Sequence, residues 1–391
     1  MIIFRLAYRN IKGAGLRTWL NVAVLSFIYV LIIWHQGLFT GMYEQGTRAV
    51  IEEEIAGGQY WHEDYDPFDP LTIDDSHSAV PPEITDNIQN KKAVPVLIRQ
   101  GAIYPAGRMQ SVLIRGIDPG QTVLDMPTAK LGAEEKVLPV LIGQRMAKNI
   151  QLNIGDNITI RWRDVHGTFD AVEGEVVEIM RTLVPGIDKG QLWVPIEKLR
   201  EMTGLKDEAT VIVVDRDIAP RTDMNNWVFR DHKFLLRDMD EMIMSKRVGG
   251  SIMYVILLFL ALLAIFDTQI LSIFRRRKEI GTLISLGMTR KHVVSLFTLE
   301  GAMHGILAAA AAAVYGAPFI YWFAKTGMGF PVETIEEYGF ALSDRIFPIY
   351  SAGLILITVF IVMVTVTIVS YLPSRKISKL NPTEALKGKI A

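Results

Sequence analysis

Four stretches of the chain are apolar over 20 residues or more and carry almost no charge, at 20–40, 248–274, 293–324 and 349–372. About 20 apolar residues in a helix cross the hydrocarbon core of a bilayer, because each residue adds about 1.5 Å of rise. The pattern therefore predicts an α-helical membrane protein with four transmembrane helices. The first stretch is too long for the apolar region of a signal peptide and no A-x-A site follows it, so we expect a retained anchor.

Positive charge is distributed unevenly around these stretches. Residues 1–19, 275–292 and 373–391 together carry 15 Lys and Arg against two acidic residues, whereas 325–348 carries four acidic and two basic residues. Cytoplasmic segments next to membrane helices are enriched in Lys and Arg. We therefore expect both termini and the loop 275–292 in the cytoplasm, with 41–247 and 325–348 outside. Residues 1–19 have the pattern of an amphipathic helix on the inner membrane surface.

The long outer segment 41–247 alternates short β-branched runs with short helical patterns. About 200 residues suffice for an independent core. Mixed strands and helices of this kind predict a large extracytoplasmic α+β domain. The expected strands are 94–99, 110–116, 137–141, 158–162, 173–179, 192–194 and 211–214, and the expected helices are 143–150, 196–202 and a stretch near 238–246. Residues 60–82 are rich in Asp, Pro and aromatic residues and should be irregular.

Composition narrows the function classes. The chain has 391 residues, half of them hydrophobic, with 41 Lys and Arg against 42 Asp and Glu. This balance disfavours a nucleic-acid-binding protein. The chain has no Cys, which excludes disulfides, Cys-ligated metals and thiol nucleophiles. It has no G-x-x-x-x-G-K-[ST] sequence either, so it should not bind ATP phosphates in a P-loop.

Asp267, Glu300 and His304 are ionisable residues that fall within the predicted membrane helices. Such residues are costly at membrane depth unless paired or hydrated, so each is a functional candidate. Asp267 and Glu300 could share a polar site near the inner leaflet, and Asp267 and His304 could form a coupled pair. Gly301, Gly305 and Ala309 recur every four residues, a spacing that favours close helix packing within the chain or across a dimer.

The outer segment 62–77 gathers His and Asp residues, but their spacing matches no defined Ca²⁺ or Zn²⁺ site. We interpret it as a solvated acidic loop and predict no metal site. No nucleophile-elbow sequence or clustered catalytic set is present, so we predict no catalytic residues in this chain.

Six motifs of this chain, taken in order, resemble those of ABC-transporter permeases of the MacB/FtsX superfamily. Within this superfamily, the chain most resembles the lipoprotein-releasing permeases LolC and LolE. The segment after the second membrane helix reads Arg276-x-x-Glu279-Ile280-Gly281, followed by Leu286-Gly287-x-Thr289-Arg290. The other matching segments are Tyr8-Arg9-Asn10, Gly116-x-x-Pro119, Ile142-Gly143 with Gly155-Asp156, Leu299-Glu300-Gly301, and Tyr371-x-Pro373 with Asn381-Pro382.

This resemblance implies a non-catalytic permease subunit with a MacB-like periplasmic domain, in the inner membrane of the cell. It implies a separate ABC-type ATPase, which would hold ATP and Mg²⁺, and a second permease chain, identical or not. No cofactor is expected on this chain itself. The implied cargo is a lipoprotein or another amphiphile taken from the membrane lipid. Efflux of drugs or peptides, and a mechanotransmitter that activates an extracytoplasmic enzyme, remain as alternatives.

The resemblance places the ATPase contact in the loop 275–292. Gly281 and Gly287 bracket 282–286, where a short coupling helix could turn. Basic residues here also satisfy the positive-inside rule without any partner. The implied coupling residues are Arg276, Arg277, Lys278, Glu279, Ile280, Gly281, Leu286, Gly287, Thr289 and Arg290.

Overall fold

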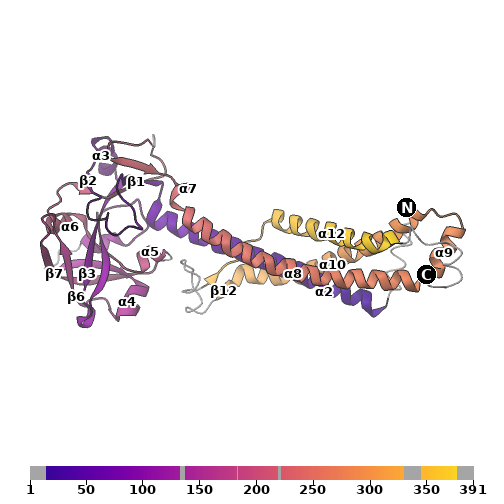
Figure 1. The fold of residues 1–391 in the computed structure, drawn as a ribbon. Helices are drawn as coiled ribbons and strands as arrows, with labels where there is room; N and C mark the ends of the chain where they lie inside the picture. The colour runs from indigo at the N-terminus through magenta and orange to yellow at the C-terminus, as the bar shows by residue number, and fades with distance from the viewer. Residues whose placement is uncertain (1–14, 133–136, 183, 219–221, 330–344, 377–391) are drawn as a thin grey trace. The chain divides into compact units, whose positions relative to one another are not determined.

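The computed structural model describes residues 15–132, 137–182, 184–218, 222–329 and 345–376 (Figure 1). The chain divides into two compact units. The helical unit comprises Met1–Met42, Ile243–Gly329 and Arg345–Ala391, and the sheet unit comprises Tyr43–Met242 and Phe330–Asp344. The predicted amphipathic helix at 1–19 and the predicted tail at 373–391 fall mostly outside the described residues.

Long apolar helices build the helical unit. They are α2 (Leu16–Val50), α8 (Arg237–Arg275), α10 (Arg290–Thr326) and α12 (Ala352–Ser374), and a short helix α9 (Arg277–Ser285) lies between α8 and α10 in the sequence. All four long helices have the length and apolar composition to cross a membrane. α2 and α8 exceed the predicted spans, and each also contributes residues to the sheet unit.

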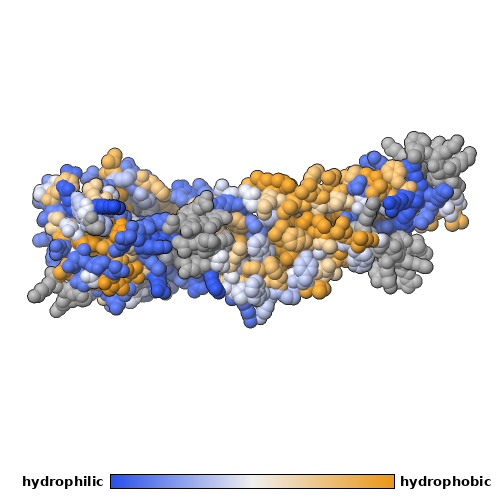
Figure 2. All heavy atoms as spheres, turned by 90° about the horizontal axis from the view of Figure 1, so that it is seen from below, coloured by the Kyte–Doolittle hydropathy of each residue, from blue (hydrophilic) through white to orange (hydrophobic). Residues whose placement is uncertain are grey.

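Apolar side chains gather over the middle of these helices (Figure 2). Val255, Phe259, Leu356 and Phe360 are among the large apolar residues exposed there. Exposed apolar surface of this extent suits contact with lipid tails rather than with water. The unit also has an interior, where Leu25, Tyr29, Ala308 and Val366 are almost fully buried.

The stripe of small residues on α10 packs inside the chain. A Cβ added at Gly301 would overlap the Ser370 side chain of α12, and one added at Gly305 would lie 2.7 Å from the Met363 sulfur. Ala309 is half-buried beside the same core. Gly301 and Gly305 therefore pack against α12 of the same chain, which is the first of the two alternatives, packing within the chain or across a dimer.

A nine-stranded sheet dominates the sheet unit, in the order β11-β1-β10-β3-β4-β8-β5-β7-β6. β3 also pairs with β6, through Gly101–Ile103 and Ile160–Trp162, so β3, β4, β8, β5, β7 and β6 form a closed ring. The nine strands are β1 (Gly58–His62), β3 (Ala93–Ile103), β4 (Gln110–Ile117), β5 (Leu138–Gly143), β6 (Asn157–Arg163), β7 (Phe169–Met180), β8 (Gln191–Pro195), β10 (Val211–Val214) and β11 (Trp227–Arg230). Two short pairs complete the strands, β2 (Ser78–Ala79) with β9 (Glu208–Ala209) and β12 (Met328–Gly329) with β13 (Arg345–Ile346).

Alternation along β6 explains why the ring encloses a core. Ile158, Ile160 and Trp162 are buried while the residues between them are exposed, as expected for a strand with one wet face. These side chains pack with Leu192 and Val194 of β8 in one apolar cluster. Short helices cover the strands: α3 (Pro82–Gln89), α4 (Gln144–Ile150), α5 (Pro185–Asp188), α6 (Ile196–Thr203) and α7 (His232–Leu235).

The seven predicted strands all occur, so the mixed character of the domain is confirmed. The prediction that 60–82 is irregular is wrong at both ends. Residues Gly58–His62 form β1, which pairs with β10 and β11, and Ser78–Ala79 form β2. The Asp- and Pro-rich sequence that follows β1 obscured this strand, because turn signals dominate any window that contains only five strand residues.

Candidate functional site

The short helix α9 has one buried and one exposed face. Ile280 is fully buried and packs with Ile273 of α8 and with Val293 and Phe297 of α10. On the other side, Lys278, Glu279, Thr282 and Ser285 are exposed. Leu286, which follows the helix, is 80% exposed. Single exposed apolar side chains are common on protein surfaces, so Leu286 is of interest only through its position directly after this two-sided helix.

Local chemistry sets the end of α9 and the start of α10. Gly287 has φ +95, a backbone conformation that favours glycine, and it ends the turn after the helix. The Thr289 side chain then accepts a hydrogen bond from the His292 N–H and caps α10. The expected helix between Gly281 and Gly287 therefore begins earlier, at Arg277. Gly281 lies inside it on the buried face.

Arg276 connects α9 to α10. Its Nη1 donates to both Glu300 carboxylate oxygens, at 3.2 and 2.9 Å, and its Nε donates to Glu279 at 2.7 Å. The guanidinium carbon also lies 4.9 Å from the centre of the Phe297 ring. Burial lowers the pKa of Arg276, but its hydrogen bond to Glu279 and the negative charge of Glu300 outweigh this effect and raise the pKa above its ordinary value. The side chain therefore stays charged and holds the two helices together.

Glu300 and His304 lie one turn apart on α10, and both are buried. The His304 Nδ1 lies 2.9 Å from the Glu300 carbonyl oxygen, whereas its Nε2 has no hydrogen-bond partner in the described part of the chain. Gln269 Oε1 and Ser370 Oγ are also buried without a partner there, and both residues converge on Gly301. Buried polar atoms left unpaired cost about 1–3 kcal/mol each, so this polar cluster is an unstable point of the helix packing.

Asp267 does not join that cluster. It is exposed on α8 and makes no side-chain hydrogen bond or ion pair with any residue that the structure describes. The structure thus brings Glu300 to Arg276, a pairing that was not foreseen, and leaves Asp267 apart from both Glu300 and His304. Gln269 and Ser370 were missed because neither is ionisable, although polar residues within an apolar span are a usable signal.

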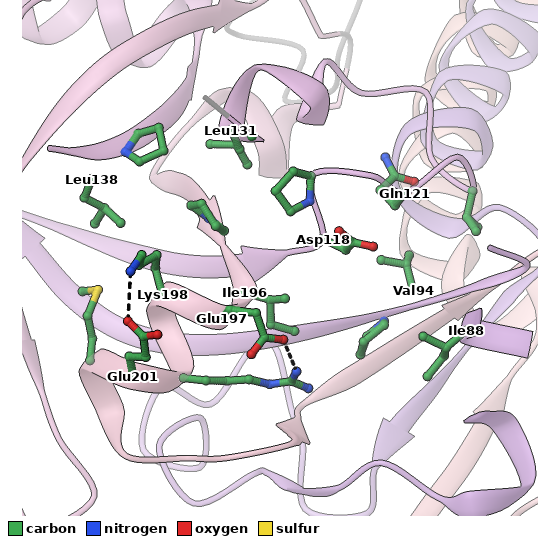
Figure 3. Close-up of a pocket in the computed structure, with 18 of the residues that line it drawn as sticks. Ile88, Val94, Asp118, Gln121, Leu131, Leu138, Ile196, Glu197, Lys198 and Glu201 are labelled. Atoms are coloured by element: carbon green, nitrogen blue, oxygen red, sulfur yellow. Dashed lines mark hydrogen bonds and ion pairs between the residues drawn. The ribbon is translucent and has the colours of Figure 1, made fainter. Parts of the chain in front are cut away.

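The sheet unit contains a cleft of about 950 Å³ (Figure 3). Its walls come from α6, from the start of β3 and from the connection between β4 and β5. Val94, Leu131, Leu138 and Ile196 give it an apolar lining. Concave apolar sites of this size are typical of ligand binding.

Charged residues of α6 line one wall of the cleft. Lys198 pairs with Glu201 at 3.1 Å, and Arg200 pairs with Glu197 at 2.8 Å. Arg200 also donates to the Glu208 carbonyl oxygen, which ties α6 to β9. The cleft therefore offers an apolar interior with paired charges beside it, suited to an amphiphilic or peptidic ligand.

The acidic segment 62–77 has its own contacts. His77 Nδ1 lies 2.5 Å from Glu208 Oε2. His62 is buried and burial lowers its pKa, against the opposing charges of Asp64 and Glu63. Among the described residues, no group of three or more His, Asp or Glu side chains is arranged to hold a metal ion.

Comparison with known proteins identifies the C-terminal third of the chain. Residues 251–382 match the family described as FtsX-like permease C-terminal, and this range includes α9, Arg276 and Glu300. The chain carries an FtsX-like permease domain. The resemblance to ABC-transporter permeases of the MacB/FtsX superfamily is therefore confirmed. Permeases of this kind are multi-pass membrane proteins that are not themselves catalytic and that work with an ATPase and a permease partner.

The sequence of a curated relative supports this assignment and aligns with most of the chain. The chain is 22% identical over 332 residues to the lipoprotein-releasing system transmembrane protein LolC of Neisseria meningitidis serogroup B, covering 75% of this chain and 77% of the relative. A solved structure, the extracellular domain of the noncanonic ABC-type transporter YknZ from Gram-positive bacteria, matches 42% of this chain and 86% of its own. Its TM-score is 0.26 at 13% identity, which supports no conclusion about the sheet unit.

Proposed function

We propose that the FtsX-like permease uses α9 as the docking point for a separate ABC-type ATPase, which binds ATP and Mg²⁺. The observation that carries this proposal is the two-sided character of α9. One face is anchored through Ile280 and Arg276, the other is polar and exposed, and Leu286 directly after the helix is 80% exposed. A docking helix needs both properties, because an unanchored helix would transmit no force and a fully buried one would contact no partner.

Movement of α9 reaches the other helices by two routes. The Arg276–Glu300 pair connects it to α10, and α10 packs closely on α12 at Gly301 and Gly305. α8 ends next to α9 at Arg275, and it runs without interruption for 39 residues from Arg237, which belongs to the sheet unit. At about 1.5 Å per residue, a continuous helix of 39 residues is roughly 58 Å long.

The proposed orientation places the termini and α9 in the cytoplasm and the sheet unit on the periplasmic side of the inner membrane. This orientation rests on the excess of Lys and Arg in 1–19, 275–292 and 373–391. The chain would pair with a second permease chain, identical or not. Movement of the paired sheet units would then act on cargo without a conventional aqueous pore.

We place cargo recognition in the cleft beside α6 and take a lipoprotein as the favoured cargo. The name of the LolC relative supports this choice, and so does the apolar interior of the cleft. Two alternatives remain, MacB-like efflux of drugs or peptides and mechanical activation of an extracytoplasmic enzyme. Mass spectrometry of the complex from native membranes separates the three: an acylated protein supports release, an outer-membrane channel supports efflux, and a hydrolase supports activation.

Leu286→Asp tests the docking role of α9, with Leu71→Asp as a matched control. Both leucines are highly exposed, at 80% and 86%, but Leu71 belongs to the sheet unit. We expect Leu286→Asp to reduce the ATPase recovered with the tagged permease by about 10-fold or more, the loss typical of a central contact residue. Leu71→Asp should leave recovery unchanged. Full recovery with Leu286→Asp would overturn the docking role, and no ATPase with the wild type would overturn the transporter function.

A further inference from the structure

A groove between the first turns of α10 and the last turns of α12 has a graded lining. Its volume is about 590 Å³. All of its lining residues belong to the helical unit, and none of those that the structure describes there is acidic. The lining residues are Arg290, Lys291, Val294, Ser295, Thr298, Leu299 and Ala302 of α10, Thr367 and Tyr371 of α12, and Arg375, which follows α12.

Polarity decreases overall with depth along this groove, although the apolar Val294 lies among the more polar residues. Arg290, Lys291 and Arg375 lie where α10 begins and α12 ends. Hydroxyl-bearing side chains follow, and Leu299 and Ala302 lie furthest along α10 from its first residue. Twelve residues separate Arg290 from Ala302, which corresponds to about 18 Å of helix. Cations, then hydroxyls, then apolar side chains follow the order of phosphate, ester and acyl chain in a phospholipid.

The hydroxyl groups of Ser295 and Tyr371 are able to donate hydrogen bonds into the groove. Thr298 and Thr367 already donate to carbonyl oxygens of their own helices, at Val294 and Met363. Ser295 and Tyr371 make no such hydrogen bond and are exposed. Both lie between the basic end and the apolar end, at the depth where the ester carbonyl oxygens of a lipid would need donors.

The helix end itself adds to the attraction for an anion. α10 is 37 residues long and its first turn lies at the basic end of the groove, where the helix dipole favours negative charge. Basic pockets between membrane helices on the cytoplasmic side bind anionic lipid head groups. We propose that this groove is a binding site for one anionic phospholipid, with its phosphate between Lys291 and Arg375 and an acyl chain along Leu299 and Ala302.

The inference requires that the four helices cross a membrane but does not depend on the proposed ATPase docking. A bound lipid here would contact α10 and α12 together, the two helices that also pack at Gly301 and Gly305. The anionic lipid content of the membrane would thereby influence the stability of that helix pair. Lipid binding and ATPase recovery are separate measurements, so either proposal is able to fail without the other.

The test compares two double variants of the full-length protein that remove the same charge. Lys291→Gln with Arg375→Gln removes two cations of the groove. Arg275→Gln with Lys376→Gln removes two exposed cations, one at the end of α8 and one just after α12, that do not line the groove. Delipidated protein is titrated with phosphatidylglycerol or phosphatidylethanolamine, and the bound lipid is counted by native mass spectrometry.

We expect wild type and the Arg275/Lys376 variant to prefer phosphatidylglycerol, and the Lys291/Arg375 variant to bind it about 10-fold more weakly. Binding of phosphatidylethanolamine should not change. Equal losses in both variants would mean general surface charge and overturn the site, as would equal binding of the two lipids by wild type. Displacement of the lipid by excess inorganic phosphate would assign the groove to a soluble anion instead.

Discussion

Each unit of the molecule secures a short helix with a buried arginine–carboxylate pair, but the two pairs have different surroundings. In the sheet unit, Arg145 of α4 contacts Asp188 of α5 at 2.9 Å, and Asp188 also accepts the Arg145 backbone N–H at 2.8 Å. In the helical unit, Arg276 contacts Glu300 at 2.9 Å, with side-chain exposures of 22% and 10%. The chemistry is the same in both places.

The difference lies in what else holds each helix. A Cβ added at Gly143 would overlap the backbone of Asp188, so the chain is tightly packed beside α4. In addition, α4 packs on the closed ring of strands through Met146 and Ala147. α9 has no sheet beneath it and leaves one face exposed. The first pair therefore belongs to a rigid scaffold, whereas the second holds a helix with an exposed face. Under the proposed function, similar ion pairs would serve stability in one unit and force transmission in the other.

The largest expected effect is on the scaffold pair. Asp188→Ala should lower the free energy of unfolding of the sheet unit by about 3 kcal/mol, because it leaves Arg145 and a backbone N–H without their acceptor. Hydrogen exchange of peptides from α4 and α5 in the full-length protein measures this loss. Protection equal to wild type would show that the ring of strands holds α4 without the pair.

Asp188→Asn separates hydrogen bonding from charge at the same position. Burial raises the pKa of Asp188, and the backbone hydrogen bond and charge of Arg145 offset only part of that rise. A raised pKa in the folded state means that protonation favours folding, so this contribution is lost as pH increases through the raised pKa. Asp188→Asn keeps an acceptor without the charge and should be close to neutral at pH 7, with a flatter dependence of stability on pH.

Helix packing in the helical unit should give the next largest effect. Gly301→Ala places a Cβ against the Ser370 side chain and should destabilise the α10–α12 contact by about 2 kcal/mol. Gly305→Ala is the matched control, because the flexible Met363 side chain is able to move aside. Thermal unfolding in detergent compares the two, and adding Ser370→Gly should rescue Gly301→Ala. Equal losses in both single variants would contradict this packing.

Glu300→Gln should lower the free energy of unfolding by only about 1 kcal/mol, because Arg276 keeps its ion pair with Glu279 and is partly accessible to water. Its effect on coupling should be larger. We expect ATPase to bind at wild-type levels in the reconstituted complex while cargo-dependent activity falls about 10-fold, a difference of 1.4 kcal/mol. Leu286→Asp should instead lose the ATPase itself. Wild-type activity of Glu300→Gln would remove the Arg276–Glu300 pair from the transmission route.

The smallest effect should come from His62 in the sheet unit. Burial lowers its pKa, so the unfolded chain binds a proton more readily than the folded one. Stability should therefore decrease, by about 1 kcal/mol or less, as pH falls below the ordinary histidine value of about 6.5. His62→Gln should weaken this dependence, measured by unfolding at several pH values. An unchanged profile would assign the acid sensitivity to other groups.

Much of the architecture was predictable from local sequence. If the four apolar stretches cross a bilayer, they must be helical, because the backbone of each stretch has to satisfy its own hydrogen bonds there. The seven runs rich in β-branched residues became strands for a similarly local reason. The short strands β1 and β11 were missed, because five or four residues beside turn-forming sequence give too weak a pattern. The position of α9 was predicted, but its first residue and the burial of Gly281 were not.

Local patterns along the chain therefore sufficed to predict the apolar spans, the charge asymmetry around them, the strand-rich segment 41–247 and the FtsX-like motifs. Which distant residues meet is visible only in the folded molecule. It joins β3 to β6 across a separation of more than 50 residues, Arg276 to Glu300, and the first turns of α10 to the end of α12 in one graded groove. Local preferences depend on a residue and its near neighbours. Pairings between distant segments depend instead on how whole surfaces pack, because the gain from the contact must exceed the entropy lost in closing the loop between them.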